Sequence, residues 1–62
     1  MLTKRENEVA LLVLDGLTNK EIANALFVSE NTVKSSLKSI FSKVGITSRR
    51  ELLRVAQMGG LI

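Results

Sequence analysis

The stretch from Ser29 to Gly45 constrains the fold of this chain more than any other. Its apolar residues recur at the spacing of one helix face, and at about 100° per residue they cover an arc of roughly 100°. These residues are Val33, Leu37, Ile40, Phe41 and Val44. The opposite side carries small polar or basic residues, namely Asn31, Ser35, Lys38 and Ser42, with Lys34 beside them. Such a helix can pack on a core through one face and approach a phosphate backbone with the other.

Three further helices are indicated by apolar periodicity and by the residues at their ends. A hydroxyl residue followed three positions later by glutamate, the pattern of a capping box, occurs before each of them. The pairs are Thr3–Glu6, Thr18–Glu21 and Ser48–Glu51. Glycine, which suits the left-handed conformation after a helix, follows the first helix at Gly16 and the third at Gly45. Helices are therefore expected at about residues 4–15, 19–26, 30–44 and 49–58.

These four helices predict an all-α fold, a compact four-helix bundle that forms one domain over residues 1–62. A chain of 62 residues is near the lower limit for a single core. The expected core includes Val9 and Val13 of the first helix together with the apolar face of 30–44. Leu11 falls among polar residues on the helical wheel, so we expect it to be exposed. It is either a lone surface leucine or a contact with a missing domain or a second subunit.

The composition argues against several classes of function. The chain contains no cysteine and no histidine, so we expect no metal site and no cofactor. Hydroxyl nucleophiles are present, but no usual general base accompanies them, and the capping boxes account for three of the glutamates. We therefore do not expect an enzyme. Tyrosine and tryptophan are also absent, which argues against stacking recognition of single strands.

The charge and hydropathy patterns favour a nucleic-acid partner in the cytoplasm. The formal net charge is +3, which is moderate for a DNA-binding module. No stretch approaches 18 apolar residues, so no membrane partner is expected. The N-terminus also lacks the pattern of a signal peptide, which indicates a cytoplasmic location.

The second and third expected helices, joined by a very short turn, predict a helix-turn-helix. In that motif the first helix crosses the DNA backbone and the second lies in the major groove. Residues near helix ends can add to the attraction of helix N-termini for phosphate. The candidate phosphate contacts are Lys20, Asn31, Thr32, Ser42, Lys43 and Arg49. The alternative for each is an N-cap neighbour or a solvated side chain.

Three segments carry a family resemblance, namely LTKRENEV, GLTNKEIA and VSENTVKSSLKSIFSKVGITSRREL. Together they resemble the LuxR-type (GerE-like) helix-turn-helix domain of bacterial transcriptional regulators, which LuxR, NarL and FixJ regulators share. The resemblance extends from Leu2 to about Gly59. One departure is Ser36, which stands where the family often has histidine and off the apolar face.

The resemblance implies sequence-specific binding of double-stranded operator DNA for transcriptional regulation, as a dimer. The helix-turn-helix would run from Asn19 to Lys38. By matching positions, the implied base contacts are Lys34, Ser35 and Lys38, and the implied dimer contacts in the last helix are Arg54, Gln57 and Met58. It also implies that the domain is the C-terminal part of a longer regulator, such as a response regulator. RNA polymerase is a further partner that the resemblance allows. The alternative is a small helical protein-interaction module without DNA binding.

Overall fold

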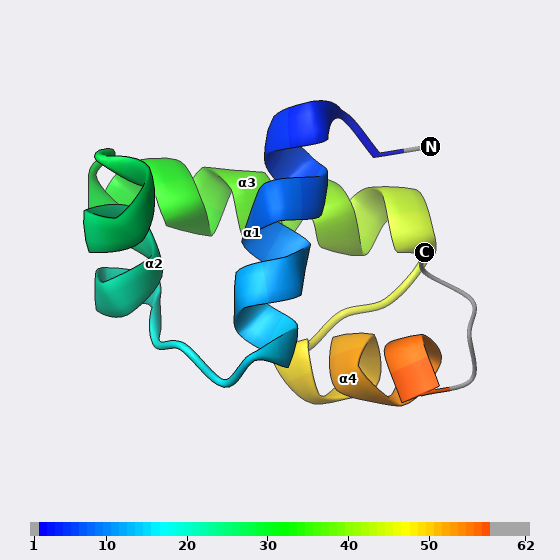
Figure 1. Ribbon diagram of the computed structural model, residues 1–62. Helices are drawn as coiled ribbons and strands as arrows, with labels where there is room; N and C mark the ends of the chain where they lie inside the picture. Colours follow the sequence, from blue (N-terminus) through cyan, green and yellow to red (C-terminus); the bar gives the residue numbers. More distant parts are fainter. Residues whose placement is uncertain (1, 58–62) are drawn as a thin grey trace.

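The computed structural model describes residues 2–57, which form four α-helices joined by short turns (Figure 1). The helices are α1 (Lys4–Leu14), α2 (Asn19–Leu26), α3 (Glu30–Val44) and α4 (Arg49–Gln57). In Figure 1, α1 crosses in front of α3, α2 lies at the first end of α3, and α4 lies beside the lower end of α1. The all-α, four-helix prediction is confirmed. Asp15 is the C-cap of α1 rather than its last residue, and residue 58 lies outside the described residues.

Side chains close to each helix start satisfy the first backbone N–H groups. The Thr3 hydroxyl accepts from the Glu6 N–H at 3.1 Å, and the Glu6 carboxylate accepts from the Thr3 N–H at 2.8 Å. Thr18 and Glu21 form the same pair of hydrogen bonds at the start of α2. At α3, the Ser29 hydroxyl accepts from the Thr32 N–H at 3.1 Å. These bonds are local, so the sequence pattern predicts them directly.

The capping box predicted at the start of α4 forms only in part. The Ser48 hydroxyl accepts from the Glu51 N–H at 3.3 Å, as expected. The Glu51 carboxylate, however, accepts from the hydroxyl of Thr47 at 2.8 Å. The Glu51 carboxylate therefore bonds to the Thr47 hydroxyl instead of the Ser48 N–H. The prediction of a full capping box at Ser48 was wrong.

The turn between α2 and α3 consists of three residues, Phe27 to Ser29. Phe27 terminates α2 in the left-handed region, at φ 59° and ψ 44°, and its side chain is almost fully exposed. The next N–H, on Val28, donates to the Ala23 carbonyl at 3.0 Å, which closes the end of the helix. This turn sets α2 and α3 close together, as a helix-turn-helix requires.

The core contains side chains from all four helices. Its fully buried members are Val9, Ala10, Val13, Ile22, Ala23, Val33, Leu37, Ile40 and Leu52. Phe41 and Val44, the other members of the predicted α3 face, pack against this core while partly buried. Leu11 is 48% exposed, which confirms the expectation for that residue. The buried face of α3 therefore leaves the other side of this helix open to solvent.

Candidate nucleic-acid interface

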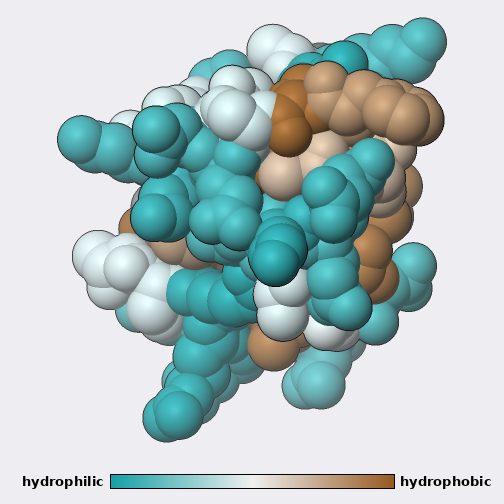
Figure 2. Space-filling model, turned by 90° about the vertical axis from the view of Figure 1, so that its left-hand side faces the viewer, coloured by the Kyte–Doolittle hydropathy of each residue, from teal (hydrophilic) through white to brown (hydrophobic). Residues whose placement is uncertain are grey.

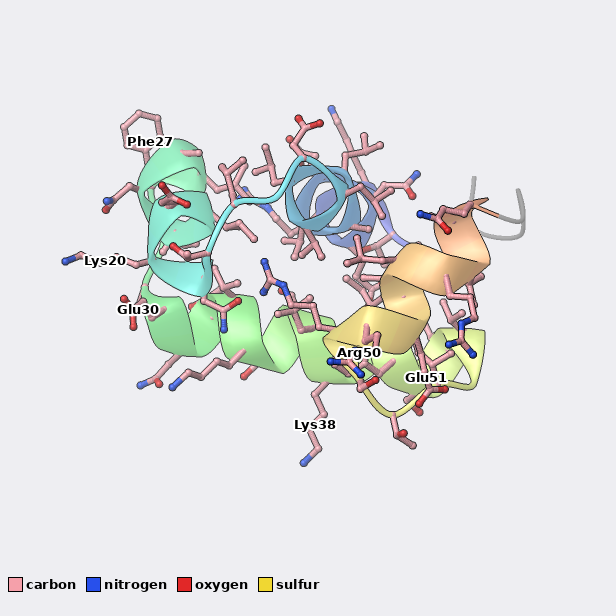
Figure 3. The ribbon with its side chains drawn as sticks, turned by 90° about the horizontal axis from the view of Figure 1, so that it is seen from below. Lys20, Phe27, Glu30, Lys38, Arg50 and Glu51 are labelled. Carbon is pink, nitrogen blue, oxygen red and sulfur yellow. The ribbon has the colours of Figure 1, made fainter. Side chains whose placement is uncertain are left out.

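The outer face of α3 presents the three residues predicted to contact bases. Lys34, Ser35 and Lys38 are all exposed. Their exposure follows from the packing, because the opposite side of α3 is buried against α1 and α2. Figure 3 shows Lys38 projecting from α3 on the side away from α1. The structure thus places the three candidates together on one accessible helix face.

Most of the predicted phosphate contacts also lie on the surface. Lys20 on α2, Asn31 and Thr32 at the start of α3, and Ser42 in its last turns are exposed. Lys20 points outward from the start of α2 in Figure 3, with the acidic Glu30 nearby in the same view. Hydrophilic side chains cover most of the face seen in Figure 2, and apolar ones gather along its upper right edge.

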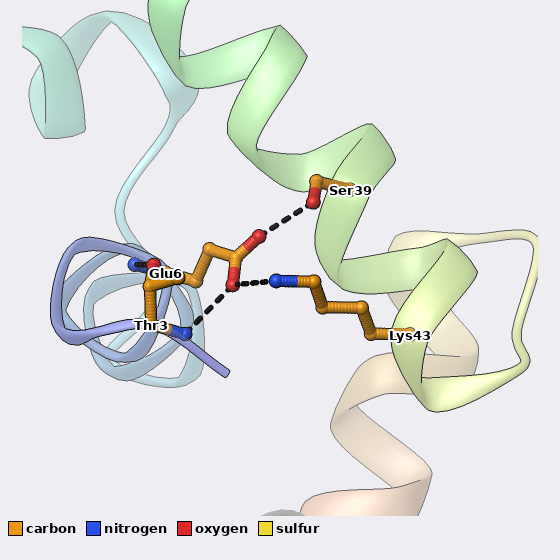
Figure 4. Close-up of polar contacts among 4 residues, drawn as sticks. All are labelled: Thr3, Glu6, Ser39 and Lys43. Carbon is orange, nitrogen blue, oxygen red and sulfur yellow. Dashed lines mark hydrogen bonds and ion pairs between the residues drawn. The ribbon is translucent and has the colours of Figure 1, made fainter. Parts of the chain in front are cut away.

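Lys43 is exposed as well, but its ammonium is paired with the buried Glu6 (Figure 4). The Lys43 Nζ lies 2.7 Å from Glu6 Oε1, and the Ser39 hydroxyl donates to Glu6 Oε2 at 2.5 Å. Glu6 is only 7% exposed although it carries a charge. The Lys43 ammonium, followed by the Ser39 hydroxyl and the Thr3 N–H, lowers the pKa of Glu6 from 4.5 to about 2. These donors outweigh the opposing effect of burial, so Glu6 stays ionised.

Arg49 is likewise bound within the domain. Its guanidinium donates to Asn19 Oδ1 at 2.9 Å and to the carbonyl oxygen of Leu17. These bonds connect the start of α4 to the first residue of α2 and to the loop before it. A phosphate bound by Lys43 or Arg49 would have to compete with these internal partners, so both contacts stay predictions.

Two of the three predicted dimer contacts lie on α4. Arg54 and Gln57 are exposed, and Met58 lies outside the described residues. Leu53 on the same helix is also exposed, at 38%, and it adds an apolar candidate to those named from the sequence.

Glu6 is the residue whose full role the sequence pattern did not indicate. Its spacing from Thr3 predicts a cap, and the cap forms. Its other partners, Ser39 and Lys43, lie 33 and 37 positions away along the chain. No local pattern could have identified such distant partners.

Within residues 2–57 the structure offers neither a membrane span nor a metal cluster. No helix there is long and apolar enough to cross a membrane. Over the same range, no three acidic or histidine side chains gather in a group that could hold a metal ion.

Comparisons with known proteins agree with this geometry. A family model described as bacterial regulatory proteins, luxR family, matches residues 1–56. The spore germination protein GerE of Bacillus subtilis is 42% identical over 62 residues, which is 94% of this chain and 84% of that protein. The DNA-binding domain of the response regulator ComA, solved in complex with the anti-activator RapF, superposes with a TM-score of 0.87 at 42% identity. That match covers 92% of this chain and 98% of that one.

Other relatives are much longer than this chain. The regulatory protein LiaR of Bacillus subtilis is 39% identical, and the match covers 98% of this chain but 29% of LiaR. A putative HTH-type transcriptional regulator of Mycobacterium bovis is 44% identical, and the chain spans 7% of its length. The family is one of DNA-binding regulators, which is not an enzyme class. The chain therefore belongs to the luxR family of bacterial regulatory proteins and is a DNA-binding helix-turn-helix domain of a kind found in transcriptional regulators.

Proposed function

We propose that this domain recognises duplex operator DNA by placing α3 in the major groove while α2 crosses the phosphate backbone. The observation that supports this most directly is the joint exposure of Lys34, Ser35 and Lys38 on the face of α3 opposite the core. A helix held on only one side leaves its other side free to enter a groove about 12 Å wide.

The chemistry of this face suits the edges of base pairs. The ammonium groups of Lys34 and Lys38 are donors, and guanine offers the O6 and N7 acceptors in the major groove. The hydroxyl of Ser35 is short, and it donates or accepts either directly or through an ordered water. We therefore assign base contacts to these three residues.

Phosphate contacts would come from the starts of α2 and α3. The dipole at a helix N-terminus attracts phosphate, and the exposed Lys20, Asn31 and Thr32 lie at these helix starts. Ser42 would add a contact from the last turns of α3. Lys43 and Arg49 would contribute only after giving up the bonds to Glu6, Asn19 and Leu17.

Dimeric recognition through α4 is part of the same proposal. Arg54 and Gln57, with Met58 beyond the described residues, would lie near a two-fold axis, and the operator would then contain two symmetry-related half-sites. A regulator of transcription works beside the bacterial chromosome, so we propose a cytoplasmic location and admit RNA polymerase as a partner. Relatives of both short and long forms exist, so membership of a longer regulator stays a prediction.

The test is fluorescence anisotropy with duplex DNA selected from a random pool, repeated across a salt series. Binding through phosphates must weaken with a log–log slope of about −0.9 per phosphate contacted. The selected sequence also reports the symmetry and spacing of the site. Absence of salt-dependent binding to any duplex would contradict the proposal and favour the alternative, a protein-interaction module.

A further inference from the structure

The orientation of α3 depends on two kinds of contact with α1. The first is apolar, between residues such as Val9 and Val13 of α1 and the buried face of α3. Apolar contacts are not directional, so by themselves they restrain rotation and sliding of a helix only through shape. The second contact is the polar cluster around Glu6, in which every bond has a required direction.

The polar cluster joins one residue of α1 to two turns of α3. Glu6 Oε2 accepts from the Ser39 hydroxyl at 2.5 Å, and Oε1 accepts from Lys43 Nζ at 2.7 Å. The carboxylate is in turn held by the Thr3 N–H at 2.8 Å. The Ser39 hydroxyl and the Thr3 N–H sit on or next to the backbone, so the buried carboxylate cannot shift far without weakening these bonds. The cluster therefore opposes both rotation of α3 about its axis and movement along it.

The two turns of α3 that bond to Glu6 adjoin the face proposed to contact bases. Ser39 is the next residue after Lys38, and it lies one helical turn after Ser35, since residues four apart are neighbours on a helix. A rotation of α3 that broke the bond from Ser39 to Glu6 would therefore move Ser35 and Lys38 by the same angle.

We propose that Glu6 is a positioning residue for sequence selectivity, because its bonds to Ser39 and Lys43 set the rotation of α3 at which Lys34, Ser35 and Lys38 face the bases. This inference rests on the proposed function, in which α3 reads the major groove. Glu6 itself is buried on the α1 side of α3 and touches no DNA in this arrangement.

The test compares Glu6→Gln with Glu8→Gln. Both substitutions lie on α1 and raise the net charge from +3 by one. Glu6→Gln also releases Lys43, so Ser39→Ala, which keeps the Glu6–Lys43 ion pair, separates positioning from a gain in phosphate contact. Glu8 is partly exposed and its only ion pair in the described structure is a long one to Arg5, at 3.9 Å. The quantity measured is selectivity, the ratio of the dissociation constants for an unrelated duplex and for the selected site. Partial unfolding lowers both affinities by the same factor and leaves this ratio unchanged.

We expect Glu6→Gln to lower the selectivity by about tenfold, the value of one lost base contact, and Glu8→Gln to leave it near that of the wild type. Ser39→Ala removes the bond from Ser39 to Glu6 without changing the net charge, and it should also lower the selectivity. We call Glu6→Gln and Ser39→Ala the clamp variants. Circular dichroism identifies a temperature at which all variants are helical, and binding is measured there. If Glu6→Gln does not fold, the comparison of Ser39→Ala with the wild type tests the inference.

Equal selectivity in the clamp variants and in Glu8→Gln would overturn this inference and leave the proposed function intact. A wild-type protein that binds every duplex equally, or none, would overturn both. Reduced selectivity in the clamp variants alone would support a positioning role that stability cannot explain.

Discussion

The Glu6 carboxylate accepts hydrogen bonds from three donors, which lower its pKa. Because its folded pKa is about 2, against an ordinary value of 4.5, folding is favoured while the group is ionised. This contribution is complete above pH 4.5 and is lost as the pH falls from there toward 2. Stability thus falls with falling pH, because the three donors stabilise the ionised form of the carboxyl group.

We therefore expect the stability gap between the wild type and Glu6→Gln to shrink as the pH falls from 5 toward 2. Urea unfolding at several pH values measures the gap directly, because carboxylates common to both proteins cancel in the difference. Glu8→Gln serves as the control and should differ little from the wild type at any pH, since its exposed pair is weak. A gap for Glu6→Gln that did not change with pH would show that its charge contributes nothing to folding.

Lys38 permits a sharper test of base contact than any other residue. Its side chain projects from α3 away from α1 and makes no internal hydrogen bond in the described structure, so truncation should not disturb the fold (Figure 3). We expect Lys38→Ala to cost about 1–3 kcal/mol of binding to the selected site and to relax preference at one base position. Affinities for a set of single-base variants measure this. A uniform loss over all sequences would assign Lys38 to a phosphate instead.

At the scale of elements, the turn of the helix-turn-helix has a phenylalanine at a position where glycine is usual. Phe27 adopts a left-handed conformation at φ 59° although it has a side chain, and that side chain is 94% exposed. The conformation costs an ordinary residue about 1–2 kcal/mol, and glycine avoids this at an entropy cost of about 0.5–1 kcal/mol. In Figure 3 the ring lies on the side of the domain opposite Lys38.

We therefore expect Phe27→Gly to raise the free energy of unfolding by about 0.5–1 kcal/mol, without loss of DNA affinity. Urea denaturation and anisotropy measure the two quantities. The matched change is Gly45→Ala, where φ is 84° and an added Cβ meets no atom within 4 Å. It should destabilise by about 1 kcal/mol through backbone conformation alone. A loss of stability in Phe27→Gly would mean that the ring makes a contact absent from this structure.

At the scale of the whole molecule, the open question is how two copies would meet. Leu53 on α4 is 38% exposed and Leu11 on α1 is 48% exposed, so each offers an apolar contact. If α4 forms the dimer, Leu53→Glu should weaken self-association by placing a charge in the interface. Leu11→Glu makes the same chemical change on another helix and should have no effect. Analytical ultracentrifugation distinguishes them, and the reverse result would move the interface to α1.

Much of the fold was predictable from the sequence because helix ends and helix faces are local properties. The bounds of α2 and α3 agree with their caps and apolar spacing, and the open face of α3 follows from the same periodicity. The partial cap of α4 was not predictable, because the choice of Glu51 between Thr47 and Ser48 depends on side-chain geometry rather than on residue type.

The sequence alone thus determined four helices and their buried faces, since each depends on residues within a few positions of one another, and its motifs along the whole domain indicated the family. Only the tertiary structure decided which charges are free. Lys34, Lys38 and Lys43 are all exposed, but Lys43 binds Glu6, and Arg49 binds Asn19 and Leu17. A lysine or arginine looks the same in a sequence wherever it lies, and its partner is set by how the helices pack.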